Sequence, residues 1–83
     1  MFSTLISIEK ITVEGQSISV KYREMRSLRG HKRYTAEIKF APNDRIVLDD
    51  DSIAGVSVRS ASLIPFAIYA RILIGNLPPP TNA

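Results

Sequence analysis

The feature that most restricts the fold of this chain is a strict alternation of apolar and polar residues in the middle of the sequence. The apolar positions are Tyr34, Ala36, Ile38 and Phe40, and the polar positions between them are Thr35, Glu37 and Lys39. Successive side chains of a β-strand point to opposite faces of its sheet, so this pattern predicts a strand with one apolar and one charged face. A strand covered by helices on both faces would be apolar throughout. The pattern therefore predicts an antiparallel sheet with one open face.

Two further strands are expected before this one. Residues 4–13 are rich in β-branched side chains, and residues 17–24 alternate between apolar and polar types. Because Gly15 lies between these segments, they are expected to form a β-hairpin that turns there. The apolar positions change parity halfway along the first segment, which predicts a β-bulge near Glu9 and Lys10.

Turn signals separate the remaining elements. Residues 25–32 break the alternation and include Gly30, so they are expected to form a loop. After the strand at 34–40, the segment 41–44 contains Pro42 and Asn43 and is typical of a β-turn. Residues 46–48 then form a short fourth strand.

The C-terminal third is expected to be helical. The residues Asp49–Ser52 favour a helix start, because carboxylates and a hydroxyl accept hydrogen bonds from the free amides of a first turn. Residues 53–61 fit either a helix or a strand, since Gly and Val are poor helix formers. A second start is possible with Ser62 as N-cap and Pro65 in the first turn, and Gly75 supplies the stop. One kinked helix and two short helices are both compatible with this pattern.

The predicted fold class is α+β: a four-stranded antiparallel meander followed by one kinked or two short C-terminal helices packed on one face of the sheet. Residues 1–76 are expected to form a single domain. Residues 77–83 contain three consecutive prolines and are expected to form an extended tail. A domain of 83 residues is marginal in stability, and a chain without cysteine cannot be supported by disulfides, so oligomerisation becomes an obvious support.

The last helix carries apolar residues on all sides, which predicts that it is buried on all sides. One side is expected to pack on the sheet; it contains Leu63, Phe66, Ala70, Leu73 and Ile74, with Tyr69 at its edge. The opposite side contains Ile64, Ile68 and Ile72, flanked by Arg71, and is expected to be the interface with a protein partner, most simply a second copy of the chain. Folding of residues 53–61 over the isoleucines and binding to a membrane surface are the alternatives.

Positive charge is concentrated in one segment. Residues 21–33 hold six basic side chains against Glu24, whereas the rest of the chain has five basic and seven acidic residues. The basic residues are Lys21, Arg23, Arg26, Arg29, Lys32 and Arg33. The alternative function is therefore a nucleic-acid-binding module that uses this segment, although a solvated surface or an acidic protein partner would explain it too. Tyr22 and Tyr34 border the segment but share the apolar alternation, so they are expected in the core.

No pattern in the chain indicates catalysis or a cofactor. His31 is the only histidine, and neither a nucleophile elbow, nor paired catalytic carboxylates, nor a glycine-rich phosphate loop is present. A cation site formed by Asp44 and the aspartates 49–51 is less economical than helix capping, because a closing glutamate is missing. The longest apolar stretch, residues 63–74, is shorter than a membrane span, and no secretory signal is recognised. The sequence thus predicts a small cytoplasmic interaction domain that is not an enzyme.

Overall fold

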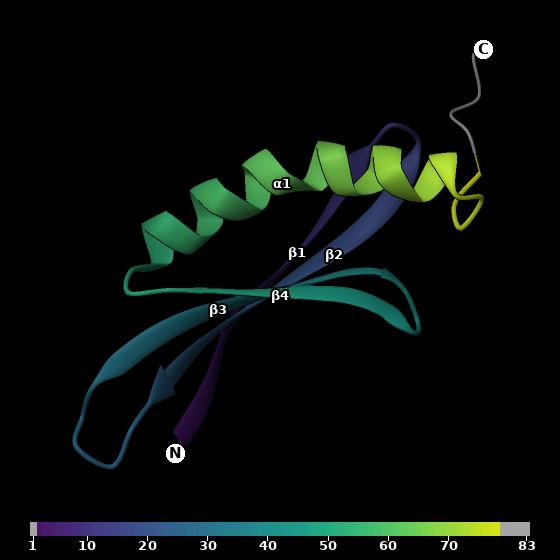
Figure 1. Cartoon of the computed structure of the whole chain (residues 1–83). Coiled ribbons are helices and arrows are strands. Elements are labelled where there is room, and N and C mark those ends of the chain that lie inside the picture. The colour runs from purple at the N-terminus through teal and green to yellow at the C-terminus, as the bar shows by residue number, and fades with distance from the viewer. Residues whose placement is uncertain (1, 79–83) are drawn as a thin grey trace.

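The computed structural model describes residues 2–78 and contains one antiparallel sheet and one helix (Figure 1). The strands are β1 (Phe2–Val13), β2 (Gln16–Arg26), β3 (Lys32–Ala41) and β4 (Asp44–Asp50), and they lie side by side in the order β1-β2-β3-β4. The helix α1 (Ile53–Leu73) follows and lies across one face of the sheet, mainly against β3 and β4. The predicted α+β fold with a four-stranded antiparallel meander is confirmed.

The first hairpin turns where the sequence predicts. Glu14 and Gly15 connect β1 to β2 with φ angles of 52° and 75°, and Val13 pairs with Gln16. Two successive positive φ values are typical of a type I′ turn, whose twist matches that of the strands it joins. Glycine adopts this conformation freely, whereas Glu14 does so at some cost.

The predicted position of the β-bulge is wrong. The register is continuous at Glu9 and Lys10, which pair with Val20 and Ser19, and it shifts between Leu5 and Ser7 instead. Glu9 therefore lies on the same side of the sheet as the buried Val20. Because β1 is an exposed edge strand, a carboxylate on this side still reaches water, and the change of parity in the sequence needs no bulge.

The second hairpin is longer than expected. Met25 pairs with Arg33 and Arg26 pairs with Lys32, so the loop that was predicted over 25–32 is reduced to residues 27–31. The loop is held by its own backbone: the amide of Ser27 donates to the carbonyl of His31 at 2.9 Å. Charged residues extend the ladder here because both faces of the sheet are open to water at this end.

Of the two helical arrangements, the structure has a single helix. Ser52 is its N-cap, and the Ser52 hydroxyl accepts a hydrogen bond from the amide of Gly55 at 2.9 Å. The helix continues past Ser62, which is therefore not the start of a second helix. Pro65 lies on the exposed side of α1, where water can hydrate the carbonyl group that proline leaves without a donor. Gly75, at φ 81°, follows the last turn as predicted.

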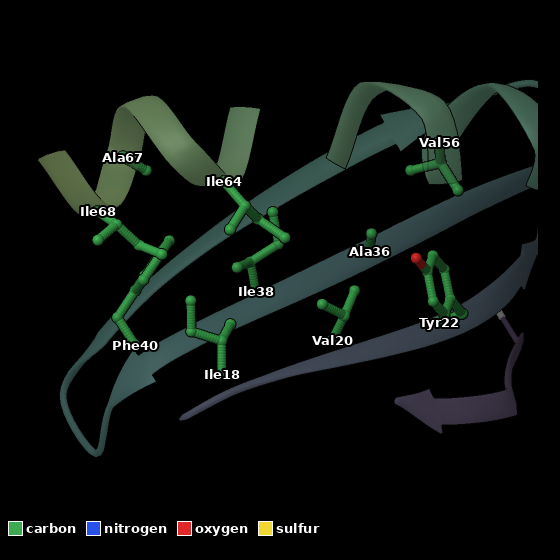
Figure 2. Packing of buried hydrophobic residues seen from close by; sticks show 10 residues of the cluster. All are labelled: Ile18, Val20, Tyr22, Ala36, Ile38, Phe40, Val56, Ile64, Ala67 and Ile68. Carbon is green, nitrogen blue, oxygen red and sulfur yellow. The ribbon is translucent and has the colours of Figure 1, made fainter. Parts of the chain in front are cut away.

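The core lies between α1 and the central strands (Figure 2). It consists of Ile18, Val20, Tyr22, Ala36, Ile38 and Phe40 from the sheet and Val56, Ile64, Ala67 and Ile68 from the helix. Ser60 is also fully buried, and its hydroxyl donates to the carbonyl of Val56 at 2.7 Å. The strand positions are the ones that the alternation in β2 and β3 assigns to the apolar face.

The prediction of which side of the helix faces the sheet is wrong. Ile64 and Ile68 are buried and Ile72 is partly buried, whereas Phe66 is 75% exposed and Leu73 is 67% exposed. Ala70 and Ile74 are exposed as well, and of the residues expected on the sheet only Leu63 packs partly against the core. Small side chains explain the choice: Ser60 and Ala67 let the helix lie close to the sheet, so that the isoleucines beside them fill the gap.

The chain beyond the helix returns to the sheet. Leu77 packs partly against the core, and the side-chain amide of Gln16 donates to the carbonyl of Pro78 at 2.9 Å. Residues 79–83 of the expected tail lie outside the described residues.

Candidate interaction surfaces

The side of α1 that points away from the sheet is an apolar surface, here called the outer face of α1. It consists of Val58, Ser62, Phe66, Tyr69 and Leu73. Its four large side chains are between 62% and 75% exposed. They follow one another at intervals of three, four or eight residues, which places them on one stripe, and spacings of three and four are those of a seam between two helices.

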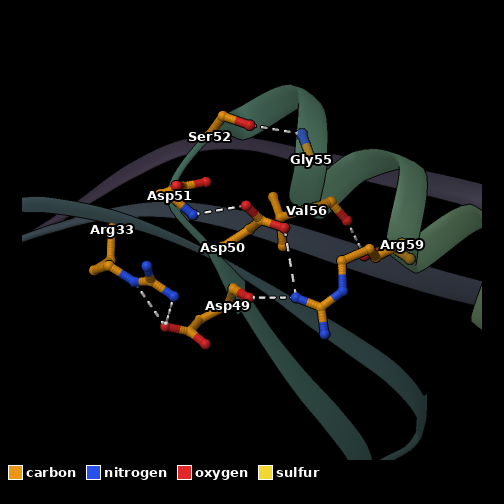
Figure 3. Close-up of polar contacts among 9 residues, drawn as sticks. Arg33, Asp49, Asp50, Asp51, Ser52, Gly55, Val56 and Arg59 are labelled. Atoms are coloured by element: carbon orange, nitrogen blue, oxygen red, sulfur yellow. Dashed lines mark hydrogen bonds and ion pairs between the residues drawn. The ribbon is translucent and has the colours of Figure 1, made fainter.

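The outer face of α1 carries no charge of its own. Arg59 and Arg71 are the only charged residues in the helix, and both reach toward β4. The Arg59 Nη1 donates to the backbone carbonyl of Asp49 at 2.6 Å and lies 3.5 Å from the Asp50 Oδ2 (Figure 3). Both guanidinium groups are directed to the sheet, so the outer face itself presents apolar and hydroxyl groups, and among the described residues charge is found only at its edges, where Arg59 and Glu14 line the adjacent hollows.

Two shallow hollows flank Phe66 on this surface. One, of about 360 Å³, lies toward Leu48 of β4, and the other, of about 450 Å³, is lined by Tyr69 and Ile72 and reaches Glu14 of the first turn. The exposed ring of Phe66 thus stands between two depressions of side-chain size. A surface with both a projecting ring and adjacent hollows can be complementary to a copy of itself.

Arg71, which the sequence predicts beside a partner surface, lies against the sheet. Its Nε lies 2.6 Å and its Nη2 lies 2.8 Å from the two carboxylate oxygens of Asp44, and its guanidinium carbon lies 4.1 Å from the centroid of the Phe40 ring. The hydrogen bonds from Arg71 lower the pKa of Asp44, and the same bonds raise the pKa of Arg71. Arg71 is therefore a link between the helix and the sheet.

The aspartates around the end of β4 are engaged separately and do not form one cluster. Asp49 pairs with Arg33 at 2.9 Å, and Asp50 accepts the amide of Asp51 at 2.7 Å, while Asp44 lies at the other end of β4. Hydrogen bonds lower the pKa of Asp50, and the largest contribution comes from the side chain of Asp51. Within residues 2–78, no group of three histidine, cysteine or acidic side chains is placed to hold a metal ion.

The basic segment of residues 21–33 is divided between three places. Arg26 and Lys32 lie beside Glu24 on the helix side of the sheet, with nitrogen–oxygen distances of 3.1 and 3.7 Å. Arg29 lies in the exposed loop between β2 and β3. The other three basic residues, Lys21, Arg23 and Arg33, lie on the helix-free face. The segment therefore does not form one continuous surface.

The helix-free face of the sheet instead collects basic residues from all four strands. This surface, the cationic sheet face, consists of Lys10, Lys21, Arg23, Arg33, Lys39 and Arg45. The linear segment does not reveal Lys10, Lys39 and Arg45 as members. The alternation of residue types could have identified these three residues, because each occupies a strand position that points away from the apolar face.

The remaining candidates take the places expected of ordinary structural residues. Tyr22 is buried, and Tyr34 is partly buried against the core, as the alternation predicts. His31 is exposed in the loop between β2 and β3, where its backbone amide donates to the Ser27 hydroxyl at 3.1 Å.

No protein-family model matches the sequence, and comparisons with curated proteins and with solved structures give no match either. By length and composition alone, α1 is sufficiently long and apolar to cross a membrane, and 28% of its most apolar window is buried in the protein.

Proposed function

We propose that this protein is a small binding domain that associates through the outer face of α1, most simply with a second copy of itself. The observation that carries the proposal is the exposure of Phe66, Tyr69 and Leu73 on one stripe of a helix whose two arginines are directed elsewhere. Burial of a large apolar side chain is worth about 1.5–3 kcal/mol, which is substantial for a domain of this size.

A second copy is the partner that requires the fewest additional features. A twofold contact brings the same stripe together twice, so the uncharged side chains of one stripe meet those of the other, and Arg59 keeps its partner Asp50 at the edge of the contact. Helices that lie on membranes usually carry cationic side chains along their polar face. In α1 these would have to be Arg59 and Arg71, and both are paired with β4.

We further propose that the domain acts by binding and has no catalytic role. His31 is exposed, and its hydrogen bond to the Ser27 hydroxyl comes from the backbone amide and not from the imidazole, which supports this proposal. The cytoplasmic location stays a prediction from the sequence.

Sedimentation of the purified chain tests the proposal. At high micromolar concentration the wild type is expected to sediment as a dimer and the Phe66→Glu variant as a monomer with an unchanged circular dichroism spectrum. Leu28→Glu is the matched control, because Leu28 is 85% exposed in the loop at the far end of the sheet, and this variant should remain dimeric (Figure 1).

A wild type that stays monomeric at these concentrations would contradict self-association. Co-sedimentation with vesicles of zwitterionic phosphatidylcholine, which carry no net charge, distinguishes membrane binding from self-association. Vesicle binding by a monomeric wild type that is lost in Phe66→Glu and retained in Leu28→Glu would assign the outer face of α1 to a membrane surface instead of a second copy.

A further inference from the structure

We infer that the cationic sheet face binds the phosphate backbone of double-stranded nucleic acid without reading its sequence. This face lies on the opposite side of the sheet from α1, so the inference does not depend on the proposed association through the helix. It also differs from the prediction based on residues 21–33, since half of the residues involved lie outside that segment.

The register places these cations in direct neighbourhood. Lys10 pairs with Ser19, Ser19 with Lys39, and Lys39 with Arg45, so three cations share one row across the four strands. Neighbouring strands are about 4.8 Å apart, and such a row therefore extends about 14 Å. Lys21 and Arg23 lie beside this row on β2 and lengthen the positive surface along the strand.

The positive charge of this face exceeds what its acidic residues neutralise. Its six cations face two carboxylates, Glu37 and Asp49, which pair with Arg45 at 3.5 Å and with Arg33 at 2.9 Å. Among the described residues, no carboxylate lies within ion-pair distance of the other four cations, Lys10, Lys21, Arg23 and Lys39. Arg23 reaches only the Ser3 hydroxyl, at 3.4 Å. Four cations are thus available to an anion.

Hydroxyl groups accompany the lysines. A shallow hollow of about 260 Å³ on this face is lined by Lys10 and Lys39 and by the two serines Ser17 and Ser19. Lysine ammonium groups and serine hydroxyls are both common donors to phosphate oxygens in complexes with nucleic acid. Because the cations extend over all four strands, the surface fits an extended polyanion better than a single small ion.

The side chains that are missing from the face favour a duplex over a single strand. Proteins that bind single strands usually stack bases on aromatic rings. The aromatic side chains of the sheet are Phe2, Tyr22, Tyr34 and Phe40, and all belong to the helix side by register. Contacts from this face therefore do not include base stacking, and its lysines and hydroxyls are suited to the backbone, which carries little sequence information.

The shape of the sheet decides between a duplex and a membrane. The strands twist strongly about one another along an extended molecule that measures 51 × 23 × 18 Å (Figure 1). A twisted face meets a planar bilayer over only part of its length, whereas it can follow the curved backbone of a duplex. The exposed Ile8 and Val47 on this face make anionic vesicles a necessary comparison.

Fluorescence anisotropy with a labelled 20-base-pair DNA duplex tests the inference. With four phosphate contacts, the plot of log K against log salt is expected to have a slope of about −3.6, which corresponds to a loss of about a hundredfold between 50 and 200 mM salt. The double variant Lys10→Gln, Lys39→Gln should reduce the slope by about two. The matched control is Arg26→Gln, Lys32→Gln, which removes the same charge from the helix side and should leave the slope unchanged.

Three outcomes would overturn the inference. Absence of duplex binding at low salt would do so directly, and equal weakening by the control variant would assign binding to overall charge. Tighter binding to a single strand of the same length, to polyglutamate or to phosphatidylserine vesicles would assign the face to another partner. If Phe66→Glu abolishes dimers and leaves duplex binding intact, the inference stands independently of the helix. If the Lys10→Gln, Lys39→Gln variant keeps the wild-type slope while the dimers persist, only the inference is lost.

Discussion

Arg71 in the last turn of α1 and Asp44 at the first residue of β4 form a two-point ion pair across 27 positions of sequence. Both nitrogen–oxygen distances are below 3 Å, and the Arg71 side chain is only 16% exposed. The guanidinium also lies over the Phe40 ring, and its Nη1 donates to the carbonyl of Ala67 at 3.0 Å. This contact fixes the end of the helix that carries Tyr69 and Leu73, so it orients the outer face of α1.

Arg71→Lys should weaken the fold although it keeps the charge. Lysine cannot form two parallel hydrogen bonds to one carboxylate and cannot stack its ammonium flat on Phe40. We expect the free energy of unfolding, measured in urea, to fall by about 1–2 kcal/mol. Arg45→Lys is the control, because Arg45 pairs with Glu37 at an exposed site. This substitution should change the free energy of unfolding by less than about 0.5 kcal/mol. Equal effects of the two variants would contradict this account.

The same pair predicts how stability depends on pH. Asp44 has a lowered pKa in the folded protein, so its ionised form stabilises the fold above the ordinary pKa of about 4, and this contribution disappears as the pH falls through the lower folded value. The wild type should therefore be more stable than Asp44→Asn at neutral pH, and the difference should shrink as the solution becomes acidic. Urea unfolding of both proteins across this range provides the measurement; a constant difference would show that the ion pair contributes nothing.

The alternation of residue types was sufficient to predict the sheet. Each apolar position of the pattern Tyr34–Phe40 lies on the helix side, because the two-residue period of a strand leaves only two faces. The helix was harder to orient. Its residues are apolar on all sides, so the pattern contains no polar stripe to mark the solvent side. In the structure the side of the helix with Ser60 and Ala67 packs on the sheet.

The surfaces were only partly predictable for a related reason. An excess of apolar helix surface was evident in the sequence, but its location depended on the packing of Ile64 and Ile68. Charge density along the chain predicts a basic surface formed by residues 21–33. The strand period sends neighbouring cations to opposite faces, as with Arg23 and Arg26, and the register brings in Lys10 and Lys39 from distant segments.

One substitution made at two isoleucines tests the orientation of the helix. Ile68 is fully buried, so Ile68→Val should lower the free energy of unfolding by about 0.5–1.5 kcal/mol. Ile74 is 70% exposed, and Ile74→Val should have almost no effect. Urea unfolding at low protein concentration, where association does not contribute, compares the two. A larger effect at Ile74 would restore the helix orientation that the sequence alone suggested.

Gly55 in the first turn of α1 is expected to resist a substitution that usually stabilises helices. Replacement of glycine by alanine inside a helix gains about 1 kcal/mol, but a Cβ atom at this position would lie 2.8 Å from the Cγ of Asp50. The amide of Asp51 and the guanidinium of Arg59 hold that carboxylate in place (Figure 3). Gly55→Ala should therefore give no gain in the wild type, whereas in an Asp50→Ala background it should raise the free energy of unfolding. Thermal denaturation with and without Gly55→Ala, in the wild type and in the Asp50→Ala background, measures this difference. An equal gain in both backgrounds would show that Asp50 moves aside without cost.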